Sequence, residues 1–223
     1  SITISWTPPA TSGGCPIDGY VVYLDDGTGF FEVNSVNDPA VRNNPGLHEL
    51  TITNFGTASL GSIVRVKVQV DNGDTAFSPS KDVLIATKPN KPSTLVQRVD
   101  DESDENKLTI EFTTLPSTDA NGSPIISYSL EVSDGTGDFK VYSGANDIKT
   151  MKTKHTLTSP WVSKGNTYGF RFRAKNAYGW SPYSDIAYLT VVGIPEKPSK
   201  LTVSAYSSTE ITVDIPTITD NGG

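Results

Sequence analysis

The sequence predicts an all-β chain of antiparallel β-sandwiches arranged end to end. Three observations lead to this fold class. Apolar and polar residues alternate with a period of two in many short stretches, as in strands with one buried face. Clusters of glycine, proline, asparagine and aspartate separate these stretches, where turns are expected. The sequence also repeats itself with a period of about 106–108 residues, the size of an independent domain.

The repeated motifs set the predicted domain organisation. They are PNKPSTL at 89–95 and PEKPSKL at 195–201, GCPIDGY at 14–20 and GSPIISY at 122–128, and DGTG at 26–29 and 134–137. We therefore predict a first module at residues 1–88 that lacks its first strand, and a second module at residues 89–193. Residues 194–223 would be the start of a third module, namely its first two strands.

The alternating stretches define the predicted strands in chain order. Their apolar faces are Ile2, Ile4 and Trp6; Tyr20, Val22 and Leu24; Val64, Val66, Val68 and Val70; Leu108, Ile110 and Phe112; Tyr128, Leu130 and Val132; Tyr168, Phe170, Phe172 and Ala174; and Ile211, Val213 and Ile215. Each set indicates a half-buried strand. No stretch has a convincing amphipathic helical pattern. Short strands between frequent turns are typical of an antiparallel sandwich.

Composition limits the classes of partner. The formal net charge is −7, which disfavours nucleic acid and anionic membranes as main partners. No run of about 18 apolar residues is present, so we predict no membrane insertion in this segment. Cys15 is the single cysteine, which excludes an internal disulfide. We expect an inert loop residue there, with an intermolecular bridge as the alternative.

These motifs resemble those of tandem fibronectin type III domains over essentially the whole chain. The resemblance is carried by ISWTPP at 4–9, PIDGYVVY at 16–23, YGFRFRAKN at 168–176, GWSPYS at 179–184, and Pro-x-x-Leu at 92–95 and 198–201. It implies Ig-like antiparallel sandwiches and says little about function.

The chain departs from the family pattern at three positions. Phe112 and Ile215 stand where the resemblance implies a tryptophan, and Val64 stands in the first module where the second has Tyr168. The family's tyrosine ties a corner of the sandwich through its hydroxyl. The first module should lack that hydrogen bond, worth about 1 kcal/mol, and should be the less rigid of the two.

Two short linkers join the modules, at residues 87–92 and 193–198, and each contains two prolines. Proline fixes φ and favours extended backbone, so we expect a semi-rigid rod with limited swing between modules. We read the chain as a segment of a longer array. An alternative is that the last two strands of one subunit complete the first module of the next.

The sequence does not indicate an enzyme. His48 and His155 are the two histidines, and each falls in the predicted E-strand region of its own module. We predict no catalytic residue, no metal site and no cofactor. Residues 25–27 and 134–135 are predicted as hairpin turns rather than calcium ligands. The acidic run at 100–105 is predicted as a solvated loop. The alternative is a weak cation site or a binding surface for a basic partner.

Trp180 is the sharpest structural candidate. Arg171 and Arg173 alternate with apolar core residues, so both should point outward on one face. Residues 180–184 (WSPYS) resemble the WSxWS box of cytokine-receptor fibronectin domains, in which a tryptophan stacks between arginines. The resemblance implies that Trp180 lies over Arg171 or Arg173, in a mainly structural cation–π cluster.

Asn121 is the predicted glycosylation site. It opens the sequon Asn-Gly-Ser at 121–123, in the predicted loop between the second and third strands. Occupancy would require secretion. The sequence contains no Arg-Gly-Asp tripeptide, so adhesion through that motif is not supported.

These observations favour a non-enzymatic structural or interaction segment of a multi-module extracellular filament, coat or adhesin. Its expected partners are neighbouring modules or other copies in a filament, with a protein or glycan ligand as an addition. One alternative is a receptor or adhesion ectodomain that binds a protein through its loops. Others are a spacer in a secreted carbohydrate-active enzyme and an intracellular elastic scaffold. The expected location is extracellular or at the cell surface.

Overall fold

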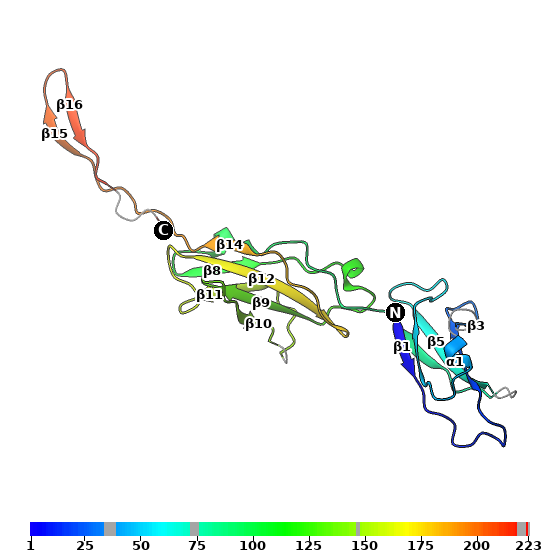
Figure 1. The fold of residues 1–223 in the computed structure, drawn as a ribbon. Coiled ribbons are helices and arrows are strands. Elements are labelled where there is room, and N and C mark those ends of the chain that lie inside the picture. The colour runs from blue at the N-terminus through cyan, green and yellow to red at the C-terminus, as the bar shows by residue number, and fades with distance from the viewer. Residues whose placement is uncertain (34–38, 72–75, 146–147, 218–221, 223) are drawn as a thin grey trace. The chain divides into compact units, whose positions relative to one another are not determined.

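The strands of the chain form sheets with exclusively antiparallel pairings among the residues that the structure describes. The structure is a computed structural model, and it describes residues 1–33, 39–71, 76–145, 148–217 and 222 (Figure 1). The chain divides into two compact units, Ser1–Thr87 with Asn121–Ser123, and Lys88–Ala120 with Pro124–Gly223. The predicted all-β fold class is confirmed.

The first unit contains a sandwich of two sheets. One sheet has the order β3 (Phe30–Glu32), β2 (Gly19–Asp25), β5 (Ile63–Asp71) and β6 (Lys81–Leu84), and the other pairs β1 (Ile2–Ser5) with β4 (Glu49–Ile52). Alternate residues of these strands meet between the sheets. The buried core consists of Tyr20, Val22, Leu24, Val41, Leu50, Ile52, Val64, Val66 and Ile85.

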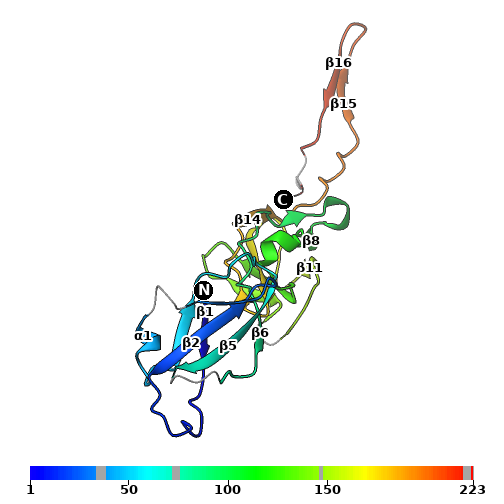
Figure 2. The ribbon, with the colours of Figure 1, turned by 90° about the vertical axis from the view of Figure 1, so that its right-hand side faces the viewer.

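A single helical turn, α1 (Pro39–Arg42), contributes to this core (Figures 1 and 2). Its Val41 side chain is fully buried. The turn packs so closely on β2 that a Cβ on Gly19 would lie 2.0 Å from the carbonyl oxygen of Arg42, so only glycine fits there. The sequence did not reveal this helix because one turn is too short to show a helical period.

The second unit contains a larger sandwich. One sheet has the order β10 (Lys140–Ser143), β9 (Ser127–Ser133), β12 (Thr167–Asn176) and β13 (Gly179–Trp180), and β14 (Ala187–Thr190) also pairs with β12. The other sheet has the order β11 (Lys154–Thr158), β8 (Lys107–Glu111) and β7 (Gln97–Arg98). Two 3-10 helices, η1 (Asp100–Glu102) and η2 (Ser117–Ala120), lie in its loops.

Aromatic rings fill the centre of the second sandwich. Phe112 stands where a tryptophan was expected, and it stacks on Phe172 with ring centroids 4.1 Å apart. Tyr128 meets the edge of Phe112 at 5.5 Å and accepts a hydrogen bond from the Leu115 backbone N–H. In the first sandwich, Trp6 makes a comparable edge contact with Tyr20 at 5.3 Å. A stacked phenylalanine pair thus fills the space beside the central tyrosine.

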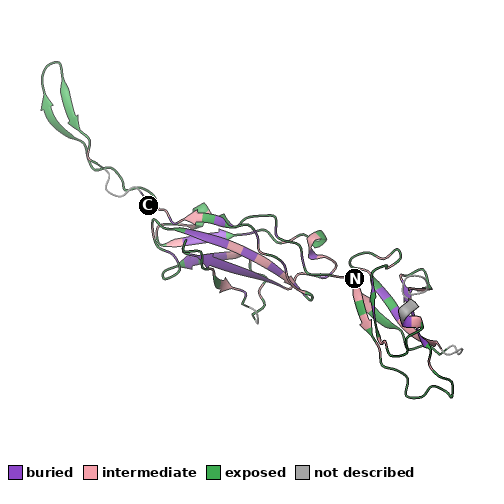
Figure 3. Cartoon of the chain, in the orientation of Figure 1, coloured by how far each residue is buried: buried purple, intermediate pink, exposed green. Residues whose placement is uncertain are grey.

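The strands are more buried than a period of two predicts. Every residue of β9 is buried, and β2 is buried except at Tyr23 (Figure 3). Thr109 alternates with the apolar residues Leu108 and Ile110 and is nevertheless buried, and its hydroxyl bonds to the Glu102 carbonyl and the Thr156 hydroxyl. Loops and long side chains cover the outer faces of the central strands.

A hairpin of β15 (Thr202–Tyr206) and β16 (Ile211–Asp214) contains the predicted strands of the third module. All residues of both strands are exposed (Figure 3). The expected half-burial of Ile211 and Val213 is therefore not seen, because a two-stranded hairpin has no second layer to cover either face.

Replacing Tyr168 with phenylalanine should destabilise the second sandwich by about 1 kcal/mol. Tyr168 is buried, and its hydroxyl accepts a hydrogen bond of 2.9 Å from the Ser163 backbone N–H. The variant has no hydroxyl, so this N–H loses its partner. Denaturant unfolding of the chain measures the loss. Tyr188→Phe is the control because that ring is 67% exposed. Equal stabilities of the two variants would contradict the assignment.

Candidate functional site

The outer face of β12 carries the most organised group of side chains in the second unit. Phe170 and Phe172 point into the core and are fully buried. Arg171 and Arg173 alternate with them and therefore occupy the opposite face. In the pairing of β12 with β9, Arg171 lies opposite Glu131 and Arg173 lies opposite Ser129.

These arginines and their neighbours form a ladder of alternating cations and aromatic rings. The Arg171 guanidinium lies 4.0 Å from the ring centroids of both Phe139 and Tyr183. Arg173 lies 4.6 Å from both Tyr183 and Trp180. The order along the ladder is Phe139, Arg171, Tyr183, Arg173, Trp180 and Lys175, with the Lys175 ammonium 5.3 Å from Trp180. Each such contact stabilises by about 0.5–1 kcal/mol at an exposed site.

A buried carboxylate anchors the ladder. Glu131 is 6% exposed, and one of its oxygens accepts hydrogen bonds from Arg171 Nε at 2.8 Å and Nη2 at 2.7 Å. Its other oxygen accepts one from the Tyr183 hydroxyl. Burial raises the pKa of Tyr183, and the bond to Glu131 raises it further, so the phenol keeps its proton as donor. The ladder is therefore fixed by directional bonds as well as by stacking.

Two serines hold the segment after β13 against β12. The Ser181 and Ser184 hydroxyl oxygens accept hydrogen bonds from the Ala174 and Phe172 backbone N–H groups, both at 3.1 Å. The backbone N–H groups of the same serines donate to the carbonyls of Ala174 and Phe172 at 2.8 Å. The serine side chains thus take the place of strand hydrogen bonds along the WSPYS segment.

The structure brings two of the three residues of the predicted cluster into direct contact. Trp180 lies over Arg173, while Arg171 lies between Phe139 and Tyr183 instead. The sequence reasoning missed Phe139 and Glu131. Glu131 alternates with the apolar residues of its own strand, so its position opposite Arg171 could have been found from strand register.

The first sandwich has a shorter version of the same arrangement. The Lys67 ammonium lies 3.9 Å from the Phe77 ring centroid, 4.2 Å from that of Phe30 and 5.5 Å from that of Tyr23. Arg65 lies 5.7 Å from Phe30. Both modules therefore cover the outer face of their larger sheet with a cation held among aromatic rings.

The DGTG turn of the first module holds two carboxylates tightly. Asp25 accepts hydrogen bonds from the backbone N–H groups of Gly27 and Gly29 and also pairs with Arg65. Asp26 accepts two bonds from Thr28 and two from Thr57. Hydrogen bonds to the charged form lower the pKa of both carboxyls, that of Asp26 most strongly.

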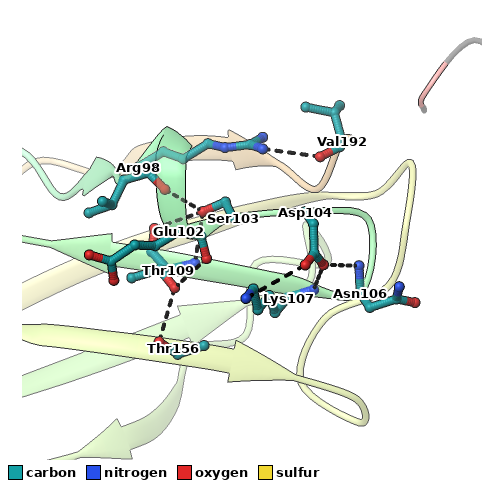
Figure 4. A network of polar contacts seen from close by, with 10 residues as sticks. Arg98, Glu102, Ser103, Asp104, Asn106, Lys107, Thr109, Thr156 and Val192 are labelled. Carbon is teal, nitrogen blue, oxygen red and sulfur yellow. Dashed lines mark hydrogen bonds and ion pairs between the residues drawn. The ribbon is translucent and has the colours of Figure 1, made fainter. Parts of the chain in front are cut away.

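Four of the five acidic residues at 100–105 pair with cations within their own sandwich. Asp100 pairs with Arg98 and Asp104 with Lys107, while Glu102 pairs with Lys154 and Glu105 with Lys164. Figure 4 shows part of this network, in which Arg98 also donates to the Val192 carbonyl at 3.0 Å. The prediction of a plain solvated loop was incomplete, because spacing alone does not show which cations lie opposite.

The remaining sequence candidates are not members of the ladder. Asn121 is half-buried with φ 52°, and Ser123 of its sequon is buried. His48 comes just before β4, and its ring meets the edge of Tyr20 at 5.6 Å. His155 is buried in β11, and burial lowers its pKa. Cys15 is exposed.

The described part of the chain contains no group of three or more side chains that could hold a metal ion. No helix in that part is long and apolar enough to cross a bilayer. The side chains on the outer face of β12 stack cations on aromatic rings and pair Arg171 with Glu131.

Known proteins resemble the chain at modest identity. No protein-family model matches it. Fibronectin type-III domain-containing protein 3A from Pongo abelii is 28% identical over 221 residues, which cover 97% of this chain and 18% of that protein. The Homo sapiens protein of the same name is also 28% identical, and that of Mus musculus is 27% identical. The chain therefore spans less than one fifth of these curated relatives.

A solved structure also aligns with the chain. The crystal structure of chicken CNTN1 FN1-FN3 domains aligns with a TM-score of 0.47 and 14% identity, covering 84% of this chain and 61% of that one. The strand pairing of the two sandwiches and the names of the sequence relatives agree in domain type. Together they support a chain of fibronectin type III-type domains.

Replacing Trp180 with alanine should destabilise the second sandwich by about 1–2 kcal/mol, since two cation contacts of about 0.5–1 kcal/mol each are lost. The midpoint of denaturant unfolding reports the change. Trp180→Phe keeps a ring over Arg173 and should lose less. If the alanine variant unfolds like the parent chain, the ladder does not stabilise the module.

Acid should destabilise the first sandwich through Asp26. Its native pKa lies below the unfolded value of about 3.9, so the native state binds fewer protons. The stabilisation is full above about pH 5 and is lost as pH falls further. Asp26→Asn should flatten this acid dependence, measured as melting temperature against pH. The same change at Asp134, which lacks the Thr57 bonds, should have a smaller effect. Parallel curves for Asp26→Asn and the parent would refute the assignment.

Proposed function

We propose that this chain is a non-enzymatic structural and interaction segment of a multi-module extracellular filament, coat or adhesin. The observation that carries the proposal is the presence of a separate hydrophobic core in each sandwich. Val96, Leu108 and Phe172 belong to one core cluster, while Tyr20 and Val64 belong to the other. Units that fold on their own side chains can be repeated along a chain, where they hold spacing and bear extension.

The organisation of the outer sheet faces supports a passive mechanical role. The cations and rings of the ladder from Phe139 to Lys175 pack on the outer face of β12, and Glu131 holds Arg171 in position. Lys67 and its three aromatic neighbours brace β5 in the same way. Side chains used in this manner stiffen the sheet.

A receptor or adhesion ectodomain is the second candidate. The ladder beside the WSPYS segment favours it, because that segment resembles the corresponding box of cytokine-receptor fibronectin domains. Exposed Tyr188 and Ile186 beside β12 would then offer apolar contact area to a protein ligand. A spacer of a secreted carbohydrate-active enzyme is a third candidate that depends on sequence outside this segment.

Antibody raised against residues 1–223 should label intact, unpermeabilised cells of the source organism or the matrix around them. Immunogold electron microscopy should then place the label along a filament or coat. Antibody against a cytosolic protein is the control for membrane integrity. Labelling that appears only after permeabilisation would contradict the extracellular assignment. Surface label in isolated spots beside a membrane would favour the receptor.

A further inference from the structure

A pocket opens in the second sandwich beside the turn that joins β9 to β10. Its volume is about 290 Å³, close to the lower end of the range of about 300–1,000 Å³ for small-molecule sites. The lining side chains that matter here are Asp134, Asp138, Lys140, Trp161 and Tyr168. A pocket of this size suits one small ring better than an extended segment.

The first module shows the same turn with both oxygens of its carboxylate hydrogen-bonded. Asp26 and Asp134 begin the two copies of DGTG, and Oδ1 of each accepts hydrogen bonds from the N–H and hydroxyl of the threonine two residues later. In the first module, Asp26 Oδ2 also accepts bonds from Thr57, at 2.6 Å from its N and 2.8 Å from its Oγ1. A Cβ on Gly56 would lie 2.3 Å from the same oxygen. The loop before β5 thus supplies both hydrogen bonds to this oxygen.

The second module leaves the corresponding carboxylate oxygen open. The loop before β12 presents Pro160 and Trp161 to the pocket. Within the described residues, the hydrogen bonds from Thr136 reach only Oδ1 of Asp134, and no residue takes the place of Thr57 at Oδ2. Trp161 is 36% exposed, and the Tyr142 ring fixes it in an edge contact at 5.1 Å. The gap between carboxylate and indole is therefore preformed.

The lining combines three kinds of contact. Asp134 and Asp138 can accept hydrogen bonds, Lys140 can donate them, and Trp161 with Tyr168 supplies apolar ring surface. A pyranose ring matches this set, because it has hydroxyls at its rim that donate and accept and a face of C–H groups that packs on an aromatic ring. A guanidinium or ammonium ligand would meet the carboxylates but would be repelled by Lys140.

We infer that this pocket binds a single neutral hexose unit at the end of a glycan. Adjacent hydroxyls of the sugar donate to Asp134 Oδ2, as the N–H and hydroxyl of Thr57 donate to Asp26 Oδ2 in the first module. Trp161 packs on the C–H face of the ring, and Lys140 donates to a further hydroxyl. The site lies on the second module only and is separate from the structural role, which would stand without it.

Amide NMR spectra of the whole chain test the inference. The probes are the methyl glycosides of glucose, galactose, mannose and N-acetylglucosamine, each titrated separately. At least one should shift the Trp161 indole N–H signal and the backbone signals of residues 134–140 in a saturable manner. Asp134→Asn should weaken that binding at least tenfold. Asp26→Asn, the matched change in the capped turn of the first module, should leave it unchanged.

Asp138→Asn is a second test variant in case the Asp134 variant does not fold. It is also expected to weaken binding of the sugar. The absence of a saturable shift with all four glycosides would overturn the inference. So would a saturable shift of the same signals with N-acetyl-arginine amide but with none of the sugars, because the pocket would then be a cation site.

Discussion

The strand β12 has to be covered on both faces, and this constraint organises the second module. Its inner face meets the opposite sheet through Phe170 and Phe172, which are fully buried. Its outer face is covered by Arg171 and Arg173, which lie between aromatic rings. The hydrocarbon parts of the arginines and the rings exclude water from the sheet, while the guanidinium groups keep polar contacts. Buried Glu131 compensates one of these charges directly.

In the first module, fewer side chains cover the outer face of the central strand. Lys67 among three rings and Arg65 beside Phe30 take the place of the two arginines and the lysine of the second module, and the buried core of that sandwich contains fewer aromatic side chains. Val64 has no hydroxyl with which to form the bond that Tyr168 makes to Ser163. Compensation comes from the DGTG turn, where two hydrogen bonds from Thr57 to Asp26 join two loops. The two copies thus distribute their polar bonds differently around a common strand arrangement.

This difference also shows how a repeated scaffold can acquire a local site. Thr57 closes the turn of one module, whereas Trp161 leaves space beside the turn of the other. The exchange lies in a loop, so the strands and the core are unaffected. Sandwich domains commonly vary in this manner, because loops carry function while the sheets hold them in place.

The sequence by itself determined the all-β class, the tandem repeat and most of the core. A period of two assigns residues such as Leu130 and Phe172 to one face without reference to any neighbour. It also placed Arg171 and Arg173 on the outer face. Only the tertiary structure decided which ring each arginine meets, that Val41 enters the core from a single helical turn, and that the acids at 100–105 have cation partners. Contacts such as that of Lys154 with Glu102 join residues far apart in the chain, and local periodicity has no information on distance in space.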